Sequence, residues 1–89
     1  MQIRQINYSS HFIRALKKLP HRETELVRER LKIFQNNCFD PRLKTHKLKG
    51  KMKDYWSFSI THSHRVLFEF LGTGKAGFVD VGERSIYKE

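Results

Sequence analysis

The stretch that decides the fold runs from Trp56 to Phe70 and has the sequence WSFSITHSHRVLFEF. Trp56, Phe58 and Ile60 alternate with serines and a threonine, and a second alternation of apolar residues follows from Val66 onward. A period of two is typical of β-strands that bury one face. The polar segment between the two halves is short enough for a tight turn. The sequence therefore predicts two antiparallel strands joined by a hairpin.

Strand signals continue on both sides of this hairpin. The Gly-Thr-Gly segment at 72–74 predicts a turn, and residues 77–81 supply a further strand. Residues 47–48 can add a short strand ahead of the hairpin. Residues 1–8 are short, partly apolar and followed by two serines, so we expect an edge strand at the start of the chain.

The region between that first strand and Pro41 has a helical period instead. A helix is predicted from His11 to Leu19, with Ser10 as its N-cap and Pro20 as its end. A second helix is predicted over residues 21–37, and the short turn between them makes an antiparallel helical hairpin. The apolar stripes of the two helices comprise Phe12, Ile13, Leu16, Leu19, Leu26, Val27, Leu31, Ile33 and Phe34.

The predicted order of elements is β-α-α-β-β-β, which indicates an α+β fold. An N-terminal strand and a helical hairpin would precede a mostly antiparallel sheet of three to four strands. A chain of 89 residues has room for one small core, so we expect a single domain over 1–89. The helices would cover one face of the sheet and leave the other face for function.

Charge and composition restrict the partners and the compartment. The 18 Lys and Arg residues against 9 Asp and Glu give a formal net charge of +9, which favours an anionic partner. The sequence has no apolar run of membrane-spanning length and no signal-peptide pattern at its start. Cys38 is the only cysteine, so we expect it to be a small structural residue. A cytoplasmic protein without a membrane partner is the expectation.

Positive charge concentrates between Pro41 and Arg65, where seven Lys or Arg residues stand against the single acid Asp54. Four lysines occupy alternate positions, so in an extended segment they would project from one side and could follow a phosphate backbone. A solvated basic loop is the alternative. Two histidines in the hairpin turn could add contacts or be ordinary loop residues, and no Cys or carboxylate at ligand spacing completes a metal site with them. The predicted nucleic-acid contacts are Lys44, Lys47, Lys49, Lys51, Lys53, His62 and His64.

Four segments carry a family resemblance: HKLKG at 46–50, YWSFSI at 55–60, HRVLFEF at 64–70 and DVGERSIY at 80–87. In this order, behind a helical hairpin, they resemble the motif series of the RelE/ParE toxin superfamily. The resemblance implies the toxin of a type II toxin–antitoxin system that cuts messenger RNA in the ribosomal decoding site. In that reaction the ribose 2′-hydroxyl attacks its own phosphate, without a metal ion or a cofactor.

The resemblance also implies a role for each of four residues. His46 stands where RNA-cleaving members place a Glu or His, and would be the base that takes the 2′-proton. Arg65 matches the arginine that contacts the scissile phosphate; its alternative is a strand-end arginine paired with a neighbouring acid. Arg84 follows Val-Gly-x, where the family has His or Arg, and would face the RNA at the catalytic site. Tyr87 would stack on a base, or else pack on the sheet.

The sequence departs from the family pattern at Ser57 and Ser59, predicted outward positions where several active members carry Lys, Arg or His. Two alternatives follow: a ParE-like inhibitor of DNA gyrase, and a non-catalytic member that binds RNA or the ribosome. The ending from Arg84 to Tyr87 favours the nuclease, and the serines favour the binding-only member. Besides ribosome and mRNA, the implied partner is an acidic antitoxin that covers the sheet and offsets the positive charge.

Overall fold

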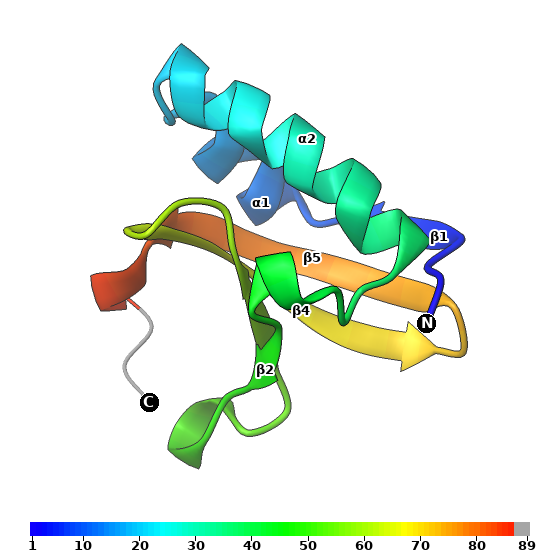
Figure 1. The fold of residues 1–89 in the computed structure, drawn as a ribbon. Helices are drawn as coiled ribbons and strands as arrows, with labels where there is room; N and C mark the ends of the chain where they lie inside the picture. Colours follow the sequence, from blue (N-terminus) through cyan, green and yellow to red (C-terminus); the bar gives the residue numbers. More distant parts are fainter. Residues whose placement is uncertain (87–89) are drawn as a thin grey trace.

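The computed structural model describes residues 1–86. Strands, α-helices and short 3-10 helices (η) form an α+β fold, which confirms the predicted class. The two α-helices lie on the same face of the sheet (Figure 1). In chain order the elements are β1 (Gln5–Tyr8), α1 (Ser10–Lys17), α2 (His21–Asn36), η1 (Pro41–Leu43), β2 (His46–Lys47), η2 (Gly50–Met52), β3 (Trp56–Ser59), β4 (His64–Gly72), β5 (Lys75–Glu83) and η3 (Arg84–Ile86).

The strands form one five-stranded sheet in the order β1-β5-β4-β3-β2. β1 runs parallel to β5, and the other neighbouring pairs are antiparallel. The mostly antiparallel sheet and the edge position of the N-terminal strand are therefore confirmed. The sheet reaches five strands because β1 joins it beside the last strand and because the two-residue β2 extends the opposite edge.

The start of α1 differs from the prediction by one residue. Ser9 is the N-cap: its hydroxyl accepts a hydrogen bond from the Phe12 N–H at 2.9 Å and donates one to the Val79 carbonyl at 3.1 Å. Ser9 keeps an extended backbone (φ −68°, ψ 155°), whereas Ser10 is already helical. The prediction of Ser10 as the cap is therefore wrong. The bond to β5 also fixes where α1 begins over the sheet.

α2 supplies the centre of the main core. The Phe34 ring is fully buried, and its centroid lies 4.9, 5.0 and 5.3 Å from those of Phe58, Phe68 and Phe78. Cys38 is buried in the same cluster, and burial raises the pKa of its thiol. The prediction of a structural cysteine is confirmed. Within residues 1–86, no helix has both the length and the apolar character needed to cross a bilayer.

The face of the sheet away from the helices is partly covered. Ser57 belongs to this face, because it pairs with Leu67 across β3 and β4, and it is fully buried. The expectation that Ser57 lies at an outward, solvent-facing position is therefore wrong, because this side of the sheet is covered there. A small second cluster results: Leu48 and Leu67 are buried, with Met52, Tyr55 and Val79 packed against them.

The lysines that follow His46 do not form an extended row. Lys47 belongs to β2, but Gly50 then adopts a positive φ of 67° and begins η2. The Lys53 N–H donates to the Gly50 carbonyl at 3.2 Å, which closes this short helix. The prediction that four lysines project from one side is therefore wrong. The tight turn comes shortly after Leu48, which is buried in the second cluster. All four side chains remain exposed: Lys47, Lys49, Lys51 and Lys53.

Candidate active site

A pocket of about 290 Å³ lies where the β3–β4 hairpin meets α2, η1 and η3. Its lining contains five cationic side chains and, among the described residues, no acidic one. Cations at such short range repel one another, so an anion with several acceptor oxygens fits this lining best. We call it the cationic pocket; it is lined by Arg30, Arg42, Lys44, Ser59, Ile60, Thr61, His62, Arg65 and Arg84.

Two of its arginines come from elements on the helical side. Arg30 lies on α2, and its Nε donates a hydrogen bond to the Ile60 carbonyl at 3.4 Å. Arg42 lies on η1 and forms a two-pronged ion pair with Asp40, at 3.0 Å from Nε and 2.9 Å from Nη2. The Arg42 side chain, followed by its backbone N–H, lowers the pKa of Asp40 to about 2. Asp40 thus holds the Arg42 guanidinium in place at the pocket.

Lys44 occupies an unusual backbone conformation. Its φ of 52° and ψ of 40° lie in the left-handed region, which costs about 1–2 kcal/mol for a residue with a side chain. This conformation ends η1 and turns the chain toward β2. Next to it, the Thr45 hydroxyl donates to the Cys38 carbonyl at 2.6 Å and anchors the turn to the core. The structure therefore holds Lys44 in a strained turn while its side chain lines the cationic pocket.

The same turn orients His46. Its Nδ1 lies 3.0 Å from the Lys44 carbonyl oxygen. Because a carbonyl can only accept, Nδ1 must carry the hydrogen in this bond. In the neutral imidazole the basic nitrogen is then Nε2. The bond thus selects the tautomer that a general base requires and fixes the plane of the ring.

His46 and Arg65 project from the same face of the sheet. The register pairs His46 with Ser57, and Ser59 with Arg65. Directly opposed residues share a face, and so do residues two apart in a strand. His46 lies one row from Arg65 and two strands away, a Cα separation of roughly 12 Å from standard sheet spacings. His46 is not one of the lining residues of the cationic pocket, so it lies beside this pocket.

The two histidines of the β3–β4 turn have different surroundings. The Thr61 hydroxyl accepts hydrogen bonds from the Ser63 N–H at 3.1 Å and the His64 N–H at 3.0 Å, and it lies 3.2 Å from His64 Nδ1. The His64 ring is therefore part of the turn itself. His62 is exposed and lines the cationic pocket. Of the two predicted contacts, His62 is the one that borders the pocket.

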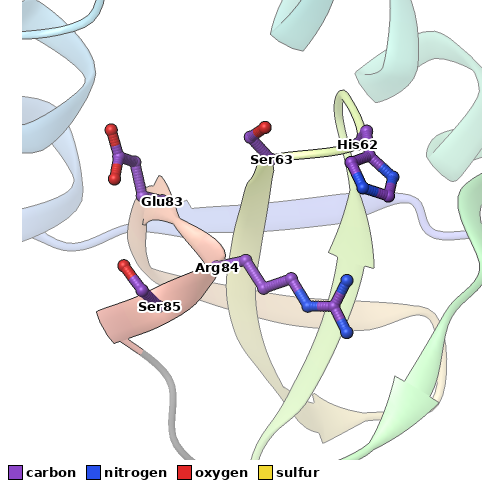
Figure 2. Close-up of a pocket in the computed structure, with 5 residues that line it drawn as sticks. All are labelled: His62, Ser63, Glu83, Arg84 and Ser85. Atoms are coloured by element: carbon purple, nitrogen blue, oxygen red, sulfur yellow. The ribbon is translucent and has the colours of Figure 1, made fainter.

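A second pocket of about 370 Å³ adjoins the first and is lined by His62, Ser63, Glu83, Arg84 and Ser85. His62 and Arg84 line both pockets, so the two form one continuous groove, which we call the hairpin groove. Figure 2 shows the Arg84 guanidinium extending to the side of the His62 ring, while Glu83 lies on the opposite side. The Arg84 N–H donates to the Ser63 carbonyl at 2.7 Å, which ties η3 to the hairpin turn.

Sequence reasoning missed Arg30 and did not select Arg42 from the basic segment. Arg30 directly precedes Leu31 in the apolar stripe, so it borders the buried side of α2; this is the available signal, and it does not identify the pocket. Of the predicted catalytic residues, Arg65 and Arg84 come together in the pocket and His46 lies beside it. Tyr87 lies outside the described residues. Within residues 1–86, no group of three His, Cys, Asp or Glu side chains is arranged to hold a metal ion.

No family model and no curated protein match this sequence, but solved structures match its fold. The YoeB/ParE toxin from Agrobacterium tumefaciens superposes with a TM-score of 0.76 at 20% identity, over 91% of this chain and 99% of that chain. YafQ from E. coli gives 0.77 at 20% identity, over 93% and 96%. A chain of the toxin–antitoxin complex RelBE2 from Mycobacterium tuberculosis gives 0.75 at 18% identity, over 90% and 96%.

These matches define the class of fold. The chain has the α+β fold of the RelE/ParE toxins, as the motif series in its sequence implies. The compared chains are covered almost from end to end, so the likeness extends to the whole arrangement of helices and sheet. This chain is thus similar in structure to the YoeB/ParE toxin, YafQ and a chain of the RelBE2 complex.

Proposed function

We propose that this protein is the toxin of a type II toxin–antitoxin system and that it cleaves messenger RNA on the ribosome. The observation that carries the proposal is the cationic pocket: five cationic side chains converge from α2, η1 and the turn after it, β4 and η3 on a chain with the RelE/ParE fold. A phosphate diester placed there would receive several charge-assisted hydrogen bonds, which strengthen as negative charge develops during cleavage.

The proposed reaction uses the 2′-hydroxyl of the substrate as the nucleophile and needs no metal ion. His46 Nε2 takes the 2′-proton, since the hydrogen of the neutral ring is on Nδ1, where it bonds to the Lys44 carbonyl. Arg65 and Arg84 stabilise the pentacovalent phosphorane by charge and hydrogen bonding. Tyr87 would contact an RNA base. The exposed lysines around η2 would hold the flanking RNA or ribosomal RNA through their charge.

One observation favours a second candidate, a member that binds RNA or the ribosome without cutting. Ser57 is fully buried and Ser59, although it lines the pocket, carries no charge. The β3 positions thus add no catalytic charge to Arg65 and Arg84. A ParE-like inhibitor of DNA gyrase has the same fold and is the third outcome that an experiment must separate.

The proposed regulator is an acidic antitoxin. A net charge of +9 favours association with an acidic chain and speeds its encounter. One of the structurally similar chains belongs to a toxin–antitoxin complex. An antitoxin that covers the hairpin groove would block the phosphate site. Its acidic side chains would also neutralise the cations there, which repel one another.

The test is induced expression in a bacterial host, with growth followed beside primer extension on an abundant translated message. The nuclease predicts growth arrest and discrete cuts inside translated codons. His46→Ala and Arg65→Ala should each relieve the arrest, whereas Arg22→Ala, which removes an exposed cation of α2 away from the pocket, should not. Arrest without cuts would indicate gyrase, and ribosome association without arrest would indicate the binding-only member. Full toxicity of both His46→Ala and Arg65→Ala would overturn the site assignment.

A further inference from the structure

Phe39 is the phenylalanine whose ring is open to solvent. The sequence contains seven phenylalanines, of which five are buried and Phe70 is half-buried, whereas Phe39 is 44% exposed. It lies between α2 and η1, just ahead of the residues that supply Arg42 and Lys44 to the cationic pocket. A single exposed apolar side chain is ordinary in a folded protein. What sets Phe39 apart is the support behind its ring and the charge beside it.

Two further aromatic rings support the Phe39 ring from behind. Trp56 of β3 meets it edge-on, with ring centroids 5.7 Å apart and planes inclined by 67°, and the Phe70 ring of β4 lies at 6.0 Å. Trp56 and Phe70 contact each other at 5.2 Å, and both pack against the main core. One side of the Phe39 ring is thus held by the core, while the rest of the ring is exposed.

Hydrogen bonds fix the backbone at Phe39 as well. Its N–H donates to Asn37 Oδ1 at 3.1 Å, and the Asp40 N–H donates to the Asn37 carbonyl at 3.0 Å. The preceding Cys38 is buried, and its carbonyl accepts a hydrogen bond from the Thr45 hydroxyl at 2.6 Å. An aromatic side chain that is already ordered loses little conformational entropy when a ligand stacks on it, so more of the contact energy contributes to affinity.

Positive charge lies beside this ring. Lys47 pairs directly with Trp56 across β2 and β3, so the two side chains share a face of the sheet, and Lys47 is exposed. Residues 39–49 carry four cations and one acid, Asp40, which is paired with Arg42. A flat ring with cations beside it suits a nucleotide, because the base stacks and the phosphate takes the charge. A protein partner fits less well, because lysine is depleted in protein–protein interfaces.

We propose that Phe39, backed by Trp56 and flanked by Lys47, is a stacking platform for an unpaired RNA base, an inference that rests on the proposed action on RNA. The base stacks on the exposed part of the Phe39 ring, and Lys47 contacts a neighbouring phosphate. Stacking uses the flat face that every base has, so the platform accepts purines and pyrimidines alike. It adds affinity for a single strand and does not select a sequence.

The platform is within reach of a strand that is held in the cationic pocket. Arg42, which lines that pocket, follows Phe39 by three residues, so their Cα atoms are at most roughly 11 Å apart. Stacked nucleotides advance about 3.4 Å each along one strand, so this distance corresponds to about three nucleotides. One RNA strand can therefore place a phosphate in the cationic pocket and a nearby base on the platform.

The test measures the Kd for a short single-stranded RNA by fluorescence anisotropy, with every 2′-oxygen methylated so that the strand cannot be cut. Phe39→Leu keeps an apolar side chain but removes the flat ring, and we expect it to weaken binding by roughly 5- to 150-fold. Phe39→Trp should bind at least as tightly as wild type. Tyr8→Leu is the matched control and should bind like wild type. Tyr8 is 45% exposed and packs against two rings, but it lies on β1 at the opposite edge of the sheet from β2.

Salt dependence separates the ring from the charge. Lys47→Gln should lower the slope of log Kd against log salt concentration by about 0.7, the value for one phosphate contact on a single strand. Phe39→Leu should leave this slope unchanged. Trp56 is the only tryptophan of the chain, so its fluorescence should change when RNA binds to wild type, and a constant signal at saturating RNA would contradict the platform.

Binding to purified ribosomes identifies the source of the base. If Phe39→Leu weakens binding only when an uncleavable message is present, the base belongs to the message. If it weakens binding equally with and without the message, the base belongs to ribosomal RNA. Both results support the platform.

Three results would overturn it: no binding of wild type to RNA or ribosomes, wild-type affinity of Phe39→Leu for both, or equal weakening in Tyr8→Leu. In the second case, loss of self-association in Phe39→Leu, measured by analytical ultracentrifugation, would assign the ring to a contact between two copies of the chain. None of these measurements requires cleavage. A wild type that binds RNA through Phe39 but cuts no message would therefore refute the nuclease and leave the platform standing.

Discussion

Two neighbouring turns of α2, one with Phe34 and one with Arg30, contact regions of opposite character. Toward its C-terminal end, Phe34 packs against three buried aromatic rings, and every partner is apolar. Nearer the middle, Arg30 meets four further cations across a pocket. The side chains of the first region make all of these contacts with other residues of the chain and need no ligand. The second gathers five cations, of which Arg42 is paired with Asp40, around a lining that suits an anion.

Features that lower the stability of the fold gather around the second region. A left-handed Lys44 and a buried Ser57 hydroxyl with no hydrogen-bond partner in the described residues accompany the five converging cations. None of these features helps folding, and all three lie beside or within the same part of the sheet. Conflicts of this kind collect at functional sites, because the rest of the fold can support them.

The largest expected effect comes from breaking the aromatic core. Phe34→Ala should lower the free energy of unfolding by about 3–5 kcal/mol, because it leaves a cavity among rings that cannot collapse into it. Urea denaturation followed by circular dichroism measures the change. Phe39→Ala is the matched control: its ring is 44% exposed, so the loss should be well under half as large. Equal losses for both variants would contradict the assignment of Phe34 as the centre of the core.

Arg30→Gln should weaken anion binding at the cationic pocket, with a smaller change in free energy than Phe34→Ala. Loss of one charge-assisted hydrogen bond to a phosphate costs about 1.5–3 kcal/mol, or roughly 10- to 100-fold in affinity. Tripolyphosphate, used as the probe anion, should raise the melting temperature of the wild-type protein and raise that of Arg30→Gln much less. Arg28→Gln, an exposed neighbour on α2, should respond like wild type. An unchanged response of Arg30→Gln would remove Arg30 from the anion site.

The fold was largely predictable, because its signals are local. The alternation from Trp56 to Phe70, the apolar stripes of the helices and the turn residues all lie within short windows, and each predicts an element that the structure contains. The errors arose where a distant contact decided the outcome. Ser9 caps α1 partly because Val79 accepts its hydroxyl. Ser57 is buried on the face away from the helices, where Leu48 and Leu67 are buried as well, and no local pattern shows that this face is covered.

The site was less predictable for the same reason. Arg65 and Arg84 could be named from their motif positions, but their convergence with Arg30 depends on how α2 crosses the sheet, which no local pattern shows. Lys47 and the lysines after it gave the strongest pattern, yet η2 interrupts it. Charge along a sequence thus predicts an anionic partner, while the tertiary packing selects which cations meet.

Ser57→Ala, on the face of the sheet away from the helices, should stabilise the fold. Its hydroxyl is buried and, among the described residues, has no hydrogen-bond partner. Replacing such a group with a methyl group removes its desolvation penalty, so the free energy of unfolding should rise by about 1 kcal/mol. Ser59→Ala, at the half-buried pocket wall, should stay within about 0.5 kcal/mol. A loss of stability in Ser57→Ala, measured in urea, would show that its hydroxyl makes a contact that stabilises the fold.

The smallest expected effect is that of low pH on the ion pair between Asp40 and Arg42, at the edge of the cationic pocket. Asp40 has its pKa lowered to about 2 by Arg42, so its stabilising effect is complete above the ordinary carboxyl range and disappears as the pH falls toward 2. When the pH is lowered from about 5 to 2.5, the melting temperature of Asp40→Asn should therefore decrease less than that of wild type. The difference should be small, because the Arg42 side chain is largely exposed. Asp54→Asn serves as the control for removing an acid outside the pair. Identical acid losses in wild type and Asp40→Asn would mean that water screens the pair completely, and that Asp40 does not hold Arg42 at the pocket.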